Sequence, residues 1–224
     1  MLVLVIDTSS AAVVAAVVDV PDLAGRADVA VLAARSPLAA RGHGELLSPN
    51  IADCLADAGA RPRNIGAVVA GTGPGPYTSL RVGLATAAAF ADAVGAPTYG
   101  VSPLDAIALA CADEPALLVA TDARRREVYH ARYAHGRRTD DIAVDRPAEV
   151  DVGGITAAAG AGGELYADVW PQLRRRPERY PEPDALARRA ADRVRAHAPS
   201  EPLIPAYLRR PDAVVPGTRK MVTQ

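Results

Sequence analysis

Three apolar runs at the start of the chain limit the possible folds more than any other feature of the sequence. They cover residues 2–7, 11–20 and 28–36, and the segments between them are too short to hold a crossover helix. Strands joined by such short connections pair in the antiparallel direction. The sequence therefore predicts a sheet that begins with three antiparallel strands.

The residues that follow alternate between helical and extended patterns. Helices are predicted at 42–60, 77–94 and 102–112, and strands at 64–71 and 96–101. Pro49 is expected to kink the first helix or to mark its true start, and Ser102 is expected to cap the third. The order β β β α β α β α favours a mixed α/β sheet, the layout of an RNase H-like half. We expect residues 1–112 to form this N-terminal lobe.

The second half of the chain has weaker patterns. A hairpin is predicted from residues 116–122 and 126–134, a strand and turn at 153–163, a loop between Pro171 and Pro183, and a helix at 183–198. We expect residues 113–224 to form a smaller C-terminal lobe that does not repeat the first completely.

Composition and charge describe an ordinary soluble protein. Half of the residues are apolar, 23% are charged and the net charge is −1, so no overall field attracts nucleic acid or an acidic membrane. Cys54 and Cys111 have no Cys or His at metal spacing and are predicted to be buried hydrophobic residues. The start of the chain lacks a basic segment and no apolar run reaches about 18 residues, so a cytoplasmic location is expected.

The stretch "VVAGTGPGPYTSLRVG" at residues 68–83 predicts a strand, a glycine-rich turn and a helix. Glycines before a helix N-terminus can hold a phosphate group. Here two prolines remove N–H donors and the lysine of the usual nucleotide-binding pattern is missing. On the residues alone, a rigid turn is favoured over a phosphate site, and Asp7 after the first strand is explained by ordinary turn chemistry.

No residue pattern predicts a catalytic centre or a metal site. His43 has Leu47 rather than a second His one helical turn later, and His130 and His135 would not share a strand face. The serines lack a nucleophile elbow. The arginine runs 124–126, 174–176 and 188–189 are interpreted mainly as solvated surface. A peptidase is disfavoured because both a zinc pair and a nucleophile–base pair are missing from the sequence.

Several stretches together resemble the bacterial TsaB (YeaZ-like) family. They are "IDTS" at 6–9, "HGELLSPNI" at 43–51, "GTGPGPYTSLRVG" at 71–83, "GVSPLDAIA" at 100–108, "DARRREVY" at 122–129 and "PAYLRRPDA" at 205–213. They follow the order of the family over nearly the whole chain. Ser79 stands where the family commonly has Gly.

The resemblance implies an actin-like (ASKHA, RNase H-like) fold with two lobes, the second reduced. It also implies a non-catalytic scaffold and activating subunit for TsaD. With TsaD and the ATPase TsaE, the subunit would support transfer of threonylcarbamoyl from threonylcarbamoyl-AMP to N6 of adenosine 37, in tRNAs that read codons beginning with A. Contact with tRNA would be indirect. No cofactor is expected on this chain alone, while ATP or ADP at the joint with TsaD, and a homodimer in isolation, are left open.

The resemblance suggests two sets of site residues. The remnant of a phosphate loop would consist of Asp7, Thr8, Gly73, Gly75 and Thr78. The partner interface would lie on the two helices of the first lobe, with the residues His43, Leu47, Ile51, Cys54, Leu55, Tyr77, Leu80, Arg81, Leu84 and Ala88. The alternative function is an independent ASKHA-type nucleotide-binding phosphotransferase or ATPase.

Overall fold

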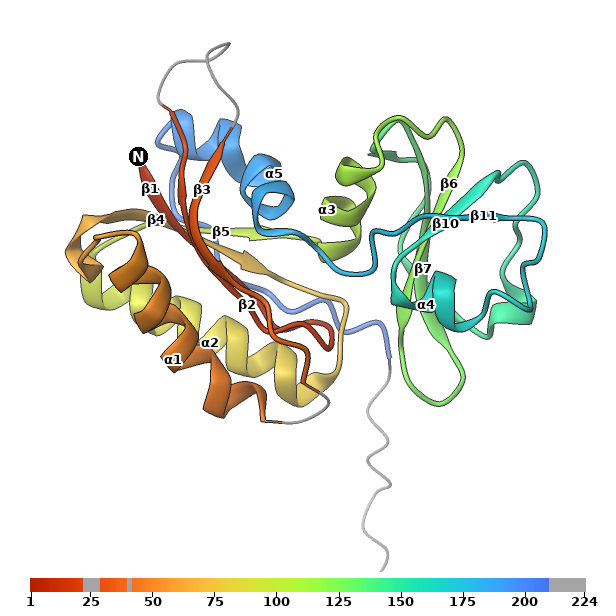
Figure 1. Ribbon diagram of the computed structural model, residues 1–224, viewed down its shortest axis with the longest axis horizontal. Coiled ribbons are helices and arrows are strands. Elements are labelled where there is room, and N and C mark those ends of the chain that lie inside the picture. Colours follow the sequence, from red (N-terminus) through yellow and green to blue (C-terminus); the bar gives the residue numbers. More distant parts are fainter. Residues whose placement is uncertain (22–28, 40–41, 210–224) are drawn as a thin grey trace, which may run out of the picture.

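Two mixed β-sheets lie next to each other in the computed structural model, which describes residues 1–21, 29–39 and 42–209 (Figure 1). The first sheet contains β1 (Leu2–Asp7), β2 (Val14–Asp19), β3 (Ala30–Arg35), β4 (Ile65–Gly71) and β5 (Thr98–Val101). The second contains β6 (Leu117–Asp122), β7 (Val128–Ala134), β8 (Arg137–Arg138), β9 (Ala143–Asp145), β10 (Ala157–Ala159) and β11 (Arg174–Arg175). The predicted α/β class is confirmed. Residue 28 of the predicted third strand and residues 210–213 of the last resembling stretch lie outside the described residues.

The first sheet has the strand order β3-β2-β1-β4-β5. Strand β1 pairs with β2 and β2 with β3 in the antiparallel direction, whereas β4 and β5 are parallel to β1. The central strands β1 and β4 are apolar along almost their whole length because helices cover both faces of the sheet. The prediction of three antiparallel strands leading into βαβ units is confirmed.

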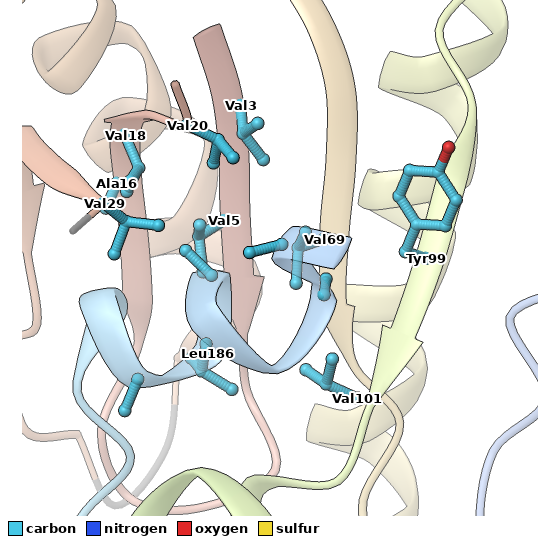
Figure 2. Packing of buried hydrophobic residues seen from close by; sticks show 14 of the residues in the cluster. Val3, Val5, Ala16, Val18, Val20, Val29, Val69, Tyr99, Val101 and Leu186 are labelled. Atoms are coloured by element: carbon cyan, nitrogen blue, oxygen red, sulfur yellow. The ribbon is translucent and has the colours of Figure 1, made fainter. Parts of the chain in front are cut away.

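Helices α1 (His43–Asp57) and α2 (Tyr77–Val94) cover one face of the first sheet. Helix α5 (Pro183–Arg195) covers the other face, where Leu186 packs among the valines of the strands (Figure 2). The division of the chain at residue 112 stays a prediction. Helix α5, however, lies far along the sequence and still completes the core of the first sheet.

Two details of the helix ends differ from the sequence prediction. Pro49 lies inside α1, which already begins at His43, so Pro49 does not mark the start of the helix. Its ring occupies an exposed position on the helix. Ser102 is the residue before α3 (Pro103–Ala110), but its side chain makes no capping hydrogen bond. The proline at the first position of α3 supplies the helical φ angle without that bond.

The second sheet has the order β11-β10-β6-β7-β8, with β9 also paired to β7. Helix α3 covers one of its faces with Leu104 and Ile107. The other face is covered by the segment that holds Trp170 and Leu173, and the short helix α4 (Ala161–Leu165) follows β10. Cys54 and Cys111 are both buried thiols, as predicted. In the predicted loop between Pro171 and Pro183, the two residues of β11 extend the sheet.

The two sheets share one spatial plan. Each has a central antiparallel hairpin, β1–β2 or β6–β7, with further strands added parallel to the first strand of that hairpin. The second sheet is reduced in strand length rather than in strand order, since β8, β10 and β11 have only two or three residues. Strands this short contain too few residues for an alternating pattern to be visible in the sequence.

A buried carboxylate joins the elements between the two sheets. Asp105 on α3 accepts a 2.8 Å hydrogen bond from the hydroxyl of Tyr133 on β7, and Arg138 lies 3.6 Å and Arg189 on α5 3.5 Å from it. Arg138 from the second sheet and Arg189 from the helix over the first sheet thus pair with one charged group. Among the described residues, no helix is both long enough and apolar enough to cross a membrane.

Candidate functional site

A cleft of about 740 Å³ lies where the turns of the two central hairpins face each other. One wall consists of the β1–β2 turn and the N-terminal ends of α1 and α2. The opposite wall consists of the β6–β7 turn, α4 and the residues before α5. The residues that line it are Ser9, Ser10, Ala11, Leu38, Ala39, Gly42, His43, Gly44, Glu45, Pro76, Thr78, Ser79, Val82, Thr121, Asp122, Arg124, Ala161, Leu165, Arg179 and Tyr180.

Asp7, the acid at the end of β1, is buried beneath the cleft rather than exposed to it. Its carboxylate accepts a 3.0 Å hydrogen bond from the hydroxyl of Ser9 and a 3.4 Å bond from the Ser9 N–H. Burial raises the pKa of Asp7 to about 6, although the Ser9 bonds act in the opposite direction. Asp7 therefore interacts with its own turn and is not exposed to the cleft.

Thr8, the next residue, is used to hold helix α2. Its hydroxyl donates a 2.6 Å hydrogen bond to the carbonyl of Ser79 and accepts a 3.1 Å bond from the N–H of Gly83. These are the two groups that a regular α-helix pairs with each other. The Thr8 side chain thus reaches the backbone of α2, and a Cβ atom at position 83 would lie 2.3 Å from its oxygen.

The glycine turn after β4 is filled by the protein itself. A Cβ atom on Gly75 would lie 2.2 Å from the carbonyl oxygen of Ser9, so the β1–β2 turn packs directly on this glycine. The Gly73–Pro74 peptide bond is cis. Of the predicted phosphate-loop residues, Thr78 lines the cleft, whereas Asp7, Thr8, Gly73 and Gly75 do not. The glycine turn thus packs closely against the β1–β2 turn.

The β6–β7 turn has an unusual backbone. Arg124, Arg125 and Arg126 have φ angles of 64°, 54° and 62°, the left-handed region that non-glycine residues seldom adopt. Asp122 accepts a 2.8 Å hydrogen bond from the Arg124 N–H. Arg209 forms an ion pair with Glu127 and also approaches the carbonyl of Arg124. The segment before the C-terminus therefore holds this turn in place.

The sequence did not identify the β6–β7 turn as a wall of a site. The available signal was an Asp at the end of a strand in each half of the chain, Asp7 and Asp122, at the start of a hairpin turn. The three arginines were interpreted as solvated surface, and their side chains are indeed exposed. What the sequence could not provide is that this turn faces the β1–β2 turn.

The predicted interface residues fall into two groups. Most point into the core under α1 and α2, and these buried residues are Leu47, Ile51, Cys54, Leu55, Leu80 and Leu84. Tyr77, Arg81 and Ala88 are exposed on α2. His43 lines the cleft at the start of α1, where its Nε2 atom lies 2.9 Å from the carbonyl oxygen of Ser10.

The exposed residues of α2 continue into an aromatic cluster. The rings of Tyr77 and Tyr207 lie 5.2 Å apart, and the Arg81 guanidinium lies 4.4 Å from the Tyr77 ring centre. The Arg81 Nε–H also donates a 2.9 Å hydrogen bond to the Tyr207 hydroxyl. Within the described ranges, no group of three or more His, Cys, Asp or Glu residues is arranged to hold a metal ion.

Both a sequence profile and solved structures relate this chain to a known family. A profile of the family "TsaD: tRNA N6-adenosine threonylcarbamoyltransferase" matches residues 36–157, more than half of the chain. The crystal structure of a Pseudomonas aeruginosa protein with similarity to peptidase YeaZ superposes with a TM-score of 0.75 at 26% identity, over 93% of this chain and 99% of that chain. The chain belongs to the TsaD family and, within it, to the YeaZ-like (TsaB) branch.

The chain also has relatives of known sequence. The chain is 46% identical over 211 residues to an uncharacterized protein of Mycobacterium tuberculosis, covering 94% of this chain and 93% of that protein. It is 31% identical over 147 residues to the tRNA threonylcarbamoyladenosine biosynthesis protein TsaB of Escherichia coli, covering 59% of this chain and 63% of that protein. The predicted actin-like (ASKHA) fold is confirmed by the YeaZ-like structures.

Proposed function

We propose that this TsaB-like chain is a scaffold and activating subunit that docks on TsaD in tRNA threonylcarbamoyladenosine synthesis. The observation that supports this most is the internal use of Asp7 and Thr8. The carboxylate pairs with Ser9 and the hydroxyl holds helix α2, so neither group is available for phosphate chemistry. A chain that keeps the fold of the family but uses these groups for packing acts through a partner, in the cytoplasm together with TsaE.

The independent phosphotransferase is less well supported by the same cleft. Such an enzyme needs a carboxylate that faces its substrate. Asp7 is 1% exposed, and Asp122 lines the cleft but is bonded to the N–H and guanidinium of Arg124. Calorimetry of the isolated chain with ATP, followed by a hydrolysis assay without partners, separates the two functions.

The docking face in this proposal is the outer side of α2. A stripe of exposed positions, three to four residues apart, runs along it: Tyr77, Arg81, Ala85, Ala88 and Asp92. Between this stripe and the segment around Leu203 lies a groove of about 660 Å³. Small alanines allow a second helix to approach closely, and Tyr and Arg are the residues that most often dominate binding energy.

The docking face can be tested with one substitution and a matched control. Ala88→Glu places a long charged side chain in the stripe and is expected to abolish co-purification with TsaD and reduce binding at least a hundredfold. Ala148→Glu makes the same change at an exposed position over the second sheet and is expected to bind normally. Equal binding by both variants would remove α2 from the interface.

The cellular role is tested by depleting the protein and digesting tRNA for nucleoside mass spectrometry. We expect threonylcarbamoyladenosine to fall, wild-type protein to restore it, and Ala88→Glu to fail to restore it. Unchanged threonylcarbamoyladenosine after depletion would refute the proposed function.

A further inference from the structure

The segment after α5 connects the docking face to the cleft. Residues 198–209, which we call the C-terminal strap, first run along the outer edge of β5, where the Glu201 N–H donates a 2.8 Å hydrogen bond to the carbonyl of Thr98. The Thr98 hydroxyl donates a 2.6 Å bond back to the Glu201 carbonyl. Farther along, the Ala206 N–H donates a 2.8 Å bond to the carbonyl of Thr72. The strap is therefore attached to the first sheet before it reaches the second lobe (Figure 1).

The end of the strap contacts both lobes. Tyr207 belongs to the docking face, because its hydroxyl accepts the 2.9 Å hydrogen bond from Arg81 and its ring lies 5.2 Å from that of Tyr77. Two residues later, Arg209 forms its ion pair with Glu127 in the β6–β7 turn. Since an extended chain spans at most about 3.6 Å per residue, roughly 7 Å of backbone joins the two contacts. A shift of Tyr207 is therefore transmitted directly to Arg209.

The β6–β7 turn receives support from outside its own hairpin. Arg124, Arg125 and Arg126 all have positive φ angles, a strained conformation for residues with a Cβ atom. Inside the turn, the Glu127 N–H donates a 3.0 Å hydrogen bond to the Arg124 carbonyl. From the strap, Arg209 approaches the same carbonyl and pairs with the Glu127 carboxylate. Strained backbone persists only where surrounding contacts hold it, so the strap stabilises the formed turn.

A partner on the docking face also covers the strap. The exposed fractions are 56% for Tyr77, 42% for Tyr207 and 38% for Leu208. Arg81 lies over the Tyr77 ring and bonds to Tyr207, so a partner that contacts one tyrosine also contacts the other. Burial of these side chains limits the freedom of the strap to move away from the second lobe.

We propose that docking on α2 restrains the β6–β7 turn through the C-terminal strap. The inference rests on the proposed docking function and adds a regulatory role to the same surface. The turn has two states: a formed one, in which Arg209 pairs with Glu127, and an open one, in which this pair is broken. A partner that holds Tyr207 favours the formed state, so the cleft wall that carries Arg124 becomes more ordered on docking. By linkage, the formed turn strengthens docking by the same factor.

The connection is tested first in the isolated full chain by amide hydrogen exchange of Ala123 and Glu127, whose N–H groups donate the hydrogen bonds that close the turn. Tyr207→Ala and Arg209→Met are each expected to raise this exchange about fivefold or more, and the double variant no further than Arg209→Met alone. Arg175→Met, which changes an exposed arginine on β11, is the control and should exchange as the wild type does. Unchanged exchange in Tyr207→Ala, or additive effects in the double variant, would overturn the proposal.

The second measurement compares the exchange of the same two amides with and without TsaD. In the wild type, TsaD is expected to slow this exchange about fivefold or more. Arg209→Met keeps the exposed stripe of α2 and should bind TsaD with about fivefold lower affinity, without the slowing. Equal slowing in the wild type and the variant, no slowing in a wild type that binds TsaD, or loss of all binding in Arg209→Met would overturn the inference. Absence of TsaD binding by the wild type would instead refute the docking role.

Discussion

The two central hairpins have the same plan but use it differently. Both begin with a strand that ends in Asp, Asp7 or Asp122, and both are followed in space by a parallel strand and a glycine-containing turn. In the first lobe the acid is buried and the next residue, Thr8, bonds to a helix backbone. In the second lobe the acid lines the cleft, and Ala123 follows it.

The different positions of Asp7 and Asp122 show that the polar groups of the two turns have different surroundings. The turn of the first lobe has become part of the core, and its hydroxyl and carboxylate stabilise the fold. The turn of the second lobe keeps its acid and Arg124 at the surface of the cleft. Two copies of one architecture therefore place the corresponding acid in the core of one lobe and at the cleft in the other.

The largest expected effect concerns the glycines behind the two hairpins. A Cβ atom would lie 2.2 Å from the Ser9 oxygen at Gly75 and 2.1 Å from the Ala120 oxygen at Gly160. We expect Gly75→Ala and Gly160→Ala each to lower the free energy of unfolding by about 3 kcal/mol or more, since backbone cannot move aside. This loss in the free energy of unfolding is measured by urea unfolding monitored by circular dichroism.

Gly154 is the control for these glycines, because it has a φ of +77° and no neighbouring atom within 4 Å. Gly154→Ala places a side chain at a positive φ angle without a clash, so the free energy of unfolding should fall by about 1 kcal/mol. Losses at Gly75 no larger than at Gly154 would contradict the close packing of the two turns.

The next effect is a pH dependence that arises from Asp7. The pKa of Asp7 is about 6 in the folded protein against an ordinary value of 3.8, so the folded state binds this proton more tightly. The corresponding stability is present below about pH 4, is lost as the pH rises to about 6, and amounts to about 3 kcal/mol. Asp7→Asn removes this titration, so the stability of the wild type relative to the variant should fall by that amount between pH 4 and pH 7. A constant difference across this range would show that Asp7 is not a buried acid.

A smaller effect is expected at Thr8, which has no counterpart in the second hairpin. Thr8→Val keeps the shape of the side chain but leaves the Ser79 carbonyl and the Gly83 N–H without the hydroxyl, at a cost of about 2 kcal/mol. Thr8→Ser keeps the hydroxyl and should cost less than half as much. Amide hydrogen exchange of Gly83 provides the local measurement. Equal stability of the Val and Ser variants would contradict the role of this hydroxyl.

The sequence predicted most of the first lobe because its strands are long and apolar and its helices have a clear period. It did not show that the second lobe follows the same strand order, since β8, β10 and β11 contain too few residues for a pattern. It located α5 but not the sheet that α5 covers, because an amphipathic period does not specify a partner.

The candidate site was predicted less well than the fold. The glycine turn and the Asp-Thr-Ser segment were identified as one region, but their mutual contact, Ser9 on Gly75, depends on tertiary packing. Leu47, Leu55 and Leu80 were assigned to the interface from the family resemblance and the apolar faces of their helices, and the structure places them in the core. Periodicity alone does not distinguish a face that packs on the chain itself from a face that packs on another protein.

The position of α5 has a consequence for the synthesis of the protein. The strands of the first sheet leave the ribosome first, but the helix that shields one of their faces is complete only at Arg195. Until then Val3, Val5 and Val69 have no cover on that side. The lobe that is translated first is therefore the last to be finished, and a nascent chain stalled before residue 183 would present a bare apolar sheet to chaperones.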